Sequence, residues 1–213
     1  MTPRSRKPAP AKLKPAPNAG LMLFVAEHSL GCDWVRLVLC EKEVEGAQVT
    51  PIRPGWPNED FLVLNPAQSL PTLADREGVL TGARVIAEYL DERYPHPPLM
   101  LPGPAGRARV RMALQSLEQE LFPLAEALQD GDADGAAPAA AELRERLRLA
   151  SRLFPAHGCF LGREYTLADS AWCALLRRLG LRGIELPAEA TALRRYAQAS
   201  FARPAYAKCF GRS

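Results

Sequence analysis

The chain has 213 residues and an apolar fraction of 47%, which is enough to bury a core in one large domain or in two small ones. No apolar run approaches the roughly 20 residues that a membrane-spanning helix needs. The N-terminal sequence MTPRSRKPAPAKLKPAPNAG has no apolar stretch behind its basic residues, so it lacks the pattern of a secretory signal. We therefore expect a cytoplasmic protein.

The formal net charge of +3 is unevenly distributed along the chain. Residues 1–19 hold five Lys and Arg and no acidic residue, which leaves a net charge of −2 on the remainder. We expect this basic, Pro-rich tail to be disordered. The tail is able to contact phosphates weakly, but a solubilising extension is favoured. The slightly acidic remainder is not typical of a protein that binds DNA directly and sequence-specifically.

The cysteines do not have the number or spacing of a disulfide framework or a zinc site. The chain has an odd number of them, and no two are spaced as CxxC, which argues against structural disulfides and against a structural zinc site. They are Cys32, Cys40, Cys159, Cys173 and Cys209. We expect five free thiols, buried as small hydrophobic residues, and no effect of reductant on stability.

The histidines give no metal site either. His28 and His157 are isolated and are interpreted as surface residues. His96 has no carboxylate or cysteine near it at metal-ligand spacing. We therefore predict no bound metal.

Residues 20–94 predict a small mixed sheet with helices on both faces. Apolar runs and alternation favour the order strand, helix, strand, helix, strand, strand, helix. The predicted strands are 21–26, 47–53, a third that begins at residue 72, and 79–81. Three helices are predicted: one that begins at residue 33, one at 61–64 and one at 84–93. Gly55 and Pro57 interrupt the chain after the second strand.

Pro71 indicates where the third strand begins. A proline has no N–H for a ladder hydrogen bond, so a strand that begins directly after it is favoured. Residues 76–78 then form the turn to the fourth strand.

The two longer helices of this half have amphipathic patterns. The first has Trp34, Leu37 and Val38 on its apolar face. Its charged residues, expected on the far side, are Arg36, Glu41 and Lys42. The face of the last helix that is expected to be apolar comprises Val85, Ile86, Tyr89 and Leu90.

The second half is predicted to be all-helical. Five prolines within residues 95–104 exclude regular structure there, so 95–105 is interpreted as an interdomain linker. Helices are then expected at 107–128, 139–153, 167–179, 188–200 and near Pro204, within a domain that covers 106–213, and residues 130–135 are expected to form a loop. Thr166 and Asp169 have the spacing of a capping box.

This layout resembles the glutathione-transferase superfamily. The segments SLPTLAD at 69–75, AEYLDERYP at 87–95 and TLAD at 166–169 carry the resemblance. It implies an N-terminal thioredoxin-like α/β domain followed by a C-terminal all-α domain, which is the glutathione-transferase fold, and a cis peptide bond before Pro71.

Within that superfamily the chain is most similar to the stringent starvation protein A family. NPAQSLPTLADRE at 65–77, YLDERYPHPPLM at 89–100 and VRLVLCEKEVE at 35–45 carry this closer resemblance. It implies a homodimer that binds the RNA polymerase holoenzyme near its sigma factor. The implied contact residues are Tyr94, Pro95, His96 and Pro97, and no cofactor is implied.

The resemblance also locates a vestigial glutathione site at Ser29, Leu70, Pro71, Gly82 and Ala83. The cis-proline element is present at Leu70 and Pro71. Gly82 and Ala83 stand where the superfamily commonly has Glu-Ser, so the side chains that hold the γ-glutamyl group are missing. Many stringent starvation proteins keep that Glu-Ser pair, so this chain also differs from its own relatives there.

Ser29 occupies the place of the residue that activates the glutathione sulfur, and Cys32 lies at the start of the helix. A helix start is able to lower a thiol pKa, but an unreactive buried Cys32 is favoured. We therefore expect a non-catalytic regulator. The alternatives are a glutathione transferase or isomerase that uses Ser29, and a paralogue that serves only as a dimerising partner.

Overall fold

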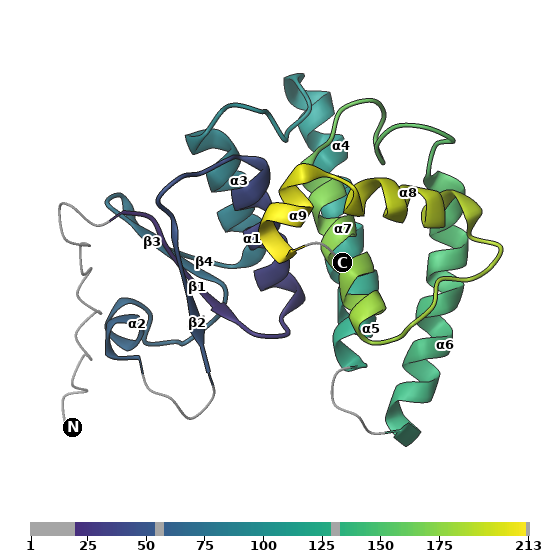
Figure 1. The fold of residues 1–213 in the computed structure, drawn as a ribbon, viewed down its shortest axis with the longest axis horizontal. Helices are drawn as coiled ribbons and strands as arrows, with labels where there is room; N and C mark the ends of the chain where they lie inside the picture. The colour runs from purple at the N-terminus through teal and green to yellow at the C-terminus, as the bar shows by residue number, and fades with distance from the viewer. Residues whose placement is uncertain (1–19, 54–57, 129–132, 212–213) are drawn as a thin grey trace, which may run out of the picture.

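The computed structural model describes residues 20–53, 58–128 and 133–211, and it has a sheet-containing domain beside a helical domain (Figure 1). The tail predicted at 1–19 lies outside the described residues. So do Gly55 and Pro57 and the first part of the loop predicted at 130–135.

The N-terminal domain is built on a four-stranded mixed sheet in the order β2-β1-β3-β4. The strands are β1 (Met22–Ala26), β2 (Gln48–Ile52), β3 (Thr72–Asp75) and β4 (Gly78–Thr81). β1 pairs in parallel with β2 and antiparallel with β3, and β3 pairs antiparallel with β4. This is the predicted thioredoxin-like sheet, and the strands agree with the expected ranges to within a residue or two.

Helices cover both faces of the sheet, as predicted. They are α1 (Leu30–Glu41), α2 (Glu59–Leu64) and α3 (Ala83–Arg93). Side chains alternate along β1 because a strand has a period of two. Leu23 and Val25 therefore join the main core, which includes α1 and α3, whereas Phe24 packs against Phe61 of α2 on the other face.

Two proline residues follow cis peptide bonds. The Leu70–Pro71 bond is cis, as the resemblance implied, and β3 begins at the next residue. The His96–Pro97 bond is also cis, which the sequence did not predict.

The C-terminal domain is helical throughout. Its helices are α4 (Gly103–Ser116), α5 (Phe122–Ala127), α6 (Ala133–Ala150), α7 (Leu167–Leu181), α8 (Thr191–Phe201) and α9 (Pro204–Phe210). A π-helical segment, Leu117–Leu121, joins α4 to α5, and a 3₁₀ turn, Ser151–Leu153, follows α6. The capping box of Thr166 and Asp169 at the start of α7 is confirmed.

Several boundaries in this domain were predicted wrongly, among them the start of α8, which is Thr191 and not residue 188. α4 begins at Gly103, inside the predicted linker, because Pro104 lies in its first turn, where a missing N–H costs nothing. The helix expected at 107–128 is divided, since Pro123 has no N–H for an i→i−4 bond. α6 begins at Ala133, so residues 133–135 belong to a helix and not to the predicted loop.

One hydrophobic core runs through both domains. Trp34 of α1 is fully buried; its indole N–H donates to the Ser170 hydroxyl of α7 at 2.9 Å, and its ring meets Phe122 edge-on. α1 thus lies between the sheet and the helical domain. No helix among the described residues is long and apolar enough to cross a membrane.

The burial of α1 and α3 corrects two sequence interpretations. Glu41 and Lys42, expected on the solvent side, are only 5% and 3% exposed, because α3 and the C-terminal helices cover the end of α1. Conversely Val85, expected on the apolar face of α3, is 55% exposed, whereas Ile86 and Leu90 are buried.

Candidate functional site

The structure brings together the residues that were predicted to form a vestigial glutathione site. Ser29 caps α1, Pro71 precedes β3 and Ala83 opens α3. Gly31, in the first turn of α1, lies close to both Pro71 and Ala83. A Cβ at Gly31 would be 3.2 Å from the Ala83 Cβ and 3.7 Å from the Pro71 Cδ. The two helix starts and the cis-proline therefore form one cluster, with Leu70 half-buried beside it.

This cluster presents little polar chemistry. Gly82 has φ of 90°, is exposed and makes no side-chain cap, and Ala83 presents a methyl group. The Ser29 hydroxyl accepts a hydrogen bond from the Cys32 N–H at 3.4 Å, so it is engaged in capping its own helix.

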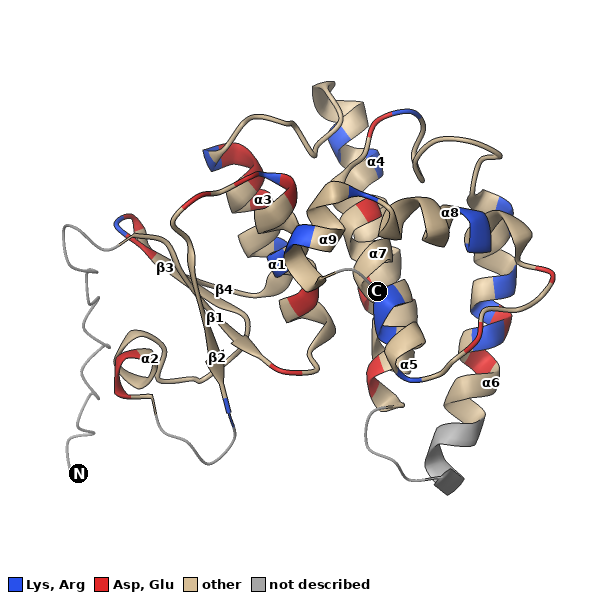
Figure 2. Ribbon diagram, in the orientation of Figure 1, with Lys and Arg blue, Asp and Glu red and all other residues tan. Residues whose placement is uncertain are grey.

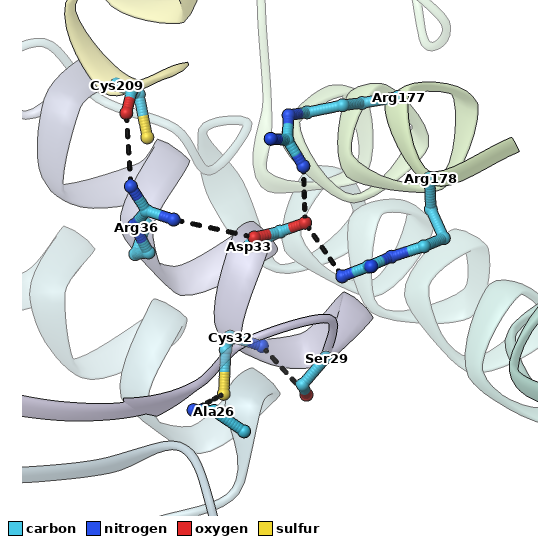
Figure 3. A network of polar contacts seen from close by, with 8 residues as sticks. All are labelled: Ala26, Ser29, Cys32, Asp33, Arg36, Arg177, Arg178 and Cys209. Carbon is cyan, nitrogen blue, oxygen red and sulfur yellow. Dashed lines mark hydrogen bonds and ion pairs between the residues drawn. The ribbon is translucent and has the colours of Figure 1, made fainter. Parts of the chain in front are cut away.

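Cys32 does not have the features of an activated thiol. It is fully buried, and its sulfur accepts a hydrogen bond from the Ala26 N–H at 3.3 Å (Figure 3). Burial raises the pKa of the Cys32 thiol, although the hydrogen bonds from Ser29 and Ala26 act in the opposite direction. The thiolate is therefore disfavoured.

The predicted partner-binding residues lie at the other end of α3. Tyr94 caps the C-terminus of the helix and is half-buried, and Pro95, His96 and Pro97 follow it, all exposed. An α-helix rises about 1.5 Å per residue, so the 11 residues of α3 separate this segment from Ala83 by roughly 16 Å. The two sets of residues form separate surfaces.

A buried ion pair holds the exposed segment in place. The Lys42 ammonium, with a side chain that is 0% exposed, donates to the Asp91 carboxylate at 2.6 Å and to the Pro97 carbonyl at 2.5 Å. The same carboxylate oxygen accepts the Leu99 N–H at 2.7 Å. Leu99 is buried, and its carbonyl accepts the N–H of Leu167 at the start of α7. The backbone is thus fixed on both sides of the exposed residues.

Sequence reasoning missed this anchor. Lys42 and Asp91 are 49 residues apart, and each lies at the end of an amphipathic helix where a charge is expected to face water. The only signal in the sequence was that Asp91 comes shortly before the Pro-rich segment, and nothing marked Lys42 as its partner.

A second charged cluster, also missed, joins the two domains. Asp33 of α1 accepts from Arg177 at 2.7 Å and from Arg178 at 3.0 Å, both on α7, and Arg36 approaches its other oxygen at 3.7 Å (Figure 3). Arg178 is 1% exposed, and burial lowers its pKa although Asp33 opposes that change. This cluster lines a cleft of about 580 Å³ between the end of β1 and α7.

Other sites find no support in the described ranges. These ranges contain no group of three or more His, Cys, Asp or Glu that could hold a metal ion. In the described part of the chain, Lys and Arg are distributed over both domains together with Asp and Glu (Figure 2).

Comparisons with known proteins assign the family. Residues 23–98 match the family model described as glutathione S-transferase, N-terminal domain. A stringent starvation protein A homolog of Haemophilus ducreyi is 34% identical over 91% of both chains, and one of Pasteurella multocida is 36% identical over 90% of both. A glutathione S-transferase from Rhodospirillum rubrum F11 superposes with a TM-score of 0.79 over 91% of this chain and 93% of its own, at 23% identity, which shows the shared fold. The chain therefore belongs to the stringent starvation protein A family, within the glutathione S-transferase superfamily.

Proposed function

We propose that this protein is a non-catalytic regulator of transcription in the stringent starvation response. It acts in the cytoplasm by binding the RNA polymerase holoenzyme near its sigma factor, through Tyr94, Pro95, His96 and Pro97. The observation that carries the proposal is that these residues are accessible while the backbone around them is held by the buried pair of Lys42 and Asp91.

The anchored segment has the properties of a protein-binding surface. A partner does not have to order it, since hydrogen bonds to the Pro97 carbonyl and the Leu99 N–H already fix its backbone. Such preorganisation lowers the entropic cost of association. The exposed prolines and the imidazole of His96 offer apolar area and one hydrogen-bonding group, which suits a small interface that depends on a few anchors.

The proposed absence of catalysis rests on Gly82 and Ala83. A side-chain carboxylate and a hydroxyl at these positions would each give glutathione a hydrogen bond to a charged group, worth about 1.5–3 kcal/mol. Loss of both corresponds to about 10²–10⁴ in affinity. The N–H groups at the start of α3 remain, but on their own they are a weak anion site.

The second candidate function is a glutathione transferase or isomerase that uses Ser29. The convergence of Ser29, Pro71 and Ala83 favours it, because it preserves the geometry of a glutathione site. Calorimetry with millimolar glutathione distinguishes the two functions. A dissociation constant in the tens of micromolar would favour the enzyme.

The regulator is proposed to be a homodimer in which the N-terminal domain of one subunit contacts the helical domain of the other. Val85 of α3 and Met112 of α4 are 55% and 68% exposed. Arg111 of α4 pairs with Glu88 of α3 at 2.7 Å, so the two helices present a joint surface. Exposed apolar side chains on a surface made by both domains suit such an interface.

The experiment is a pull-down of purified RNA polymerase holoenzyme. The variant in which Pro95, His96 and Pro97 are all replaced by alanine is expected to lose binding, and sedimentation is expected to show an intact dimer. Pro155 and His157, in an exposed loop of the helical domain, provide the matched control: their double alanine variant should bind as the wild type does. Equal binding by the triple variant would place the interface elsewhere, and a wild type that does not bind would refute the regulator.

A further inference from the structure

Two cysteines from different domains face each other where α1 packs on α9. Arg36 of α1 donates to the Cys209 carbonyl of α9 at 3.2 Å (Figure 3), and Leu37 belongs to the small core cluster against which Cys209 packs. Cys40 comes four positions after Arg36 and three after Leu37, so it lies on the same side of α1 as these two residues. Cys40 and Cys209 are near enough for each thiol to shift the pKa of the other.

The surroundings assign different states to the two sulfurs. The pKa of Cys40 is lowered, first by the hydrogen bond from Cys209 and then by the charges of Lys208 and Arg36, against the effect of partial burial. The pKa of Cys209 is raised, because it donates to Cys40 and is partly buried. The positive charges of Lys208 and Arg36 therefore favour the thiolate on Cys40 over the thiolate on Cys209. This is the arrangement of an attacking thiol beside a resolving thiol.

The other three cysteines lack such an arrangement. Cys32 and Cys173 are buried, and burial raises the pKa of Cys173 to about 12. Cys159 is half-buried, as Cys40 and Cys209 are, but desolvation raises its pKa to about 11. An oxidant that needs a thiolate is thus directed to Cys40.

We propose that Cys40 and Cys209 form an oxidisable dithiol, which a hydroperoxide converts into a disulfide between α1 and α9. The Cys40 thiolate attacks the peroxide, the O–O bond breaks, and sulfenic acid forms as hydroxide or alkoxide leaves. The Cys209 sulfur then attacks the sulfenic sulfur. The S–S bond forms, the S–O bond breaks, and the Cys209 proton leaves with the hydroxyl group as water. The two thiols lose two electrons, and the peroxide gains them.

The disulfide would fasten α9, which is otherwise held by non-covalent contacts. The Phe210 ring of α9 lies under Arg177 at 4.0 Å, and Arg177 also pairs with Asp33, so α9 adjoins the interdomain cluster. Because Cys40 and Cys209 are far apart in sequence, a disulfide between them would remove much of the conformational entropy of the unfolded chain. Tm should therefore rise on oxidation by on the order of 10 °C.

The test is peptide mapping of the full chain after treatment with a slight excess of hydrogen peroxide. Trypsin cleaves after Arg36, Lys42, Lys208 and Arg212, so the expected product is residues 37–42 joined to residues 209–212. This product should disappear on reduction, and the increase in Tm should disappear with it. A peroxide-treated protein in which both cysteines remain free to alkylate, or in which the disulfide joins two chains, would overturn the proposal.

Single substitutions test the two assigned roles. Cys209→Ser should abolish the cross-link and leave a sulfenic acid on Cys40 that dimedone traps, whereas Cys40→Ser should leave Cys209 unmodified. Cys159→Ser, which removes another half-buried thiol, should cross-link as the wild type does. Dimedone labelling of Cys209 in Cys40→Ser that equals the labelling of Cys40 in Cys209→Ser would refute the assignment of roles.

Discussion

Replacing Asp91 by asparagine would leave the Lys42 ammonium buried without an anion. The Lys42 side chain has no exposed surface, and its other partner is the neutral carbonyl of Pro97. Breaking a buried pair by removal of one partner costs about 3–5 kcal/mol, because the remaining charge stays desolvated. Asparagine keeps an oxygen that accepts a hydrogen bond, so we expect the lower end of that range.

For a chain of this length, each kcal/mol changes Tm by about 2–4 °C, so Asp91→Asn should lower Tm by on the order of 10 °C. Urea unfolding monitored by Trp fluorescence measures the free energy. Glu92→Gln is the matched control. Glu92 is the next residue of α3, but its pairing with Arg107 is exposed, and exposed pairs contribute about 0–1 kcal/mol.

A double variant separates stability from the position of the exposed segment. Lys42→Met with Asp91→Leu removes both charges and should recover most of the lost stability. It also removes the hydrogen bonds to the Pro97 carbonyl and the Leu99 N–H, so polymerase binding should stay weak in a well-folded protein. A cost below about 1 kcal/mol for Asp91→Asn, or a double variant that binds polymerase as the wild type does, would refute the anchoring argument.

Three further predictions concern other parts of the chain. Asp33→Asn should cost about 3 kcal/mol, since Arg178 would be left buried with a weaker partner; chemical unfolding checks it, and a neutral result would mean that water solvates the guanidinium. Asp169→Asn should cost about 1–3 kcal/mol, since the Asp169 carboxylate accepts the N–H groups of Thr166 and Phe160; thermal unfolding measures this loss. Deletion of residues 1–19 should leave Tm unchanged because that segment has no apolar periodicity to bury, and a loss of several degrees would show that it packs on the body.

The fold could be predicted because its signals are local. Pro71 determines where β3 begins, and alternation along residues 47–53 determines β2, so the sheet followed from short stretches of sequence. Thr166 and Asp169 identified the start of α7 for the same reason. Prolines led to wrong helix boundaries at Pro104 and Pro123, which lie in the first turn of a helix, and at Pro138, which lies inside α6 although the helix was predicted to begin after it.

The polar contacts behind the candidate sites could not be predicted, because their partners are distant in sequence. Lys42 meets Asp91 across 49 residues and Asp33 meets Arg178 across 145. A charged residue on a helix is usually solvated, and only the packing of α1 inside the molecule reverses that expectation. The proximity of Cys40 and Cys209 could not be predicted for the same reason, since spacing rules detect only cysteines that are close in sequence.

The shared core around α1 also bears on how this protein could be divided or recombined. Trp34 is fully buried, and its indole N–H bonds to Ser170 of the other domain, so a separated N-terminal domain would expose that indole and leave its donor to water. Neither half should fold as an independent module, and the whole chain should unfold in one transition. A thioredoxin-like domain taken from another member of the superfamily would therefore have to match the surface of α7 before it could replace residues 20–94.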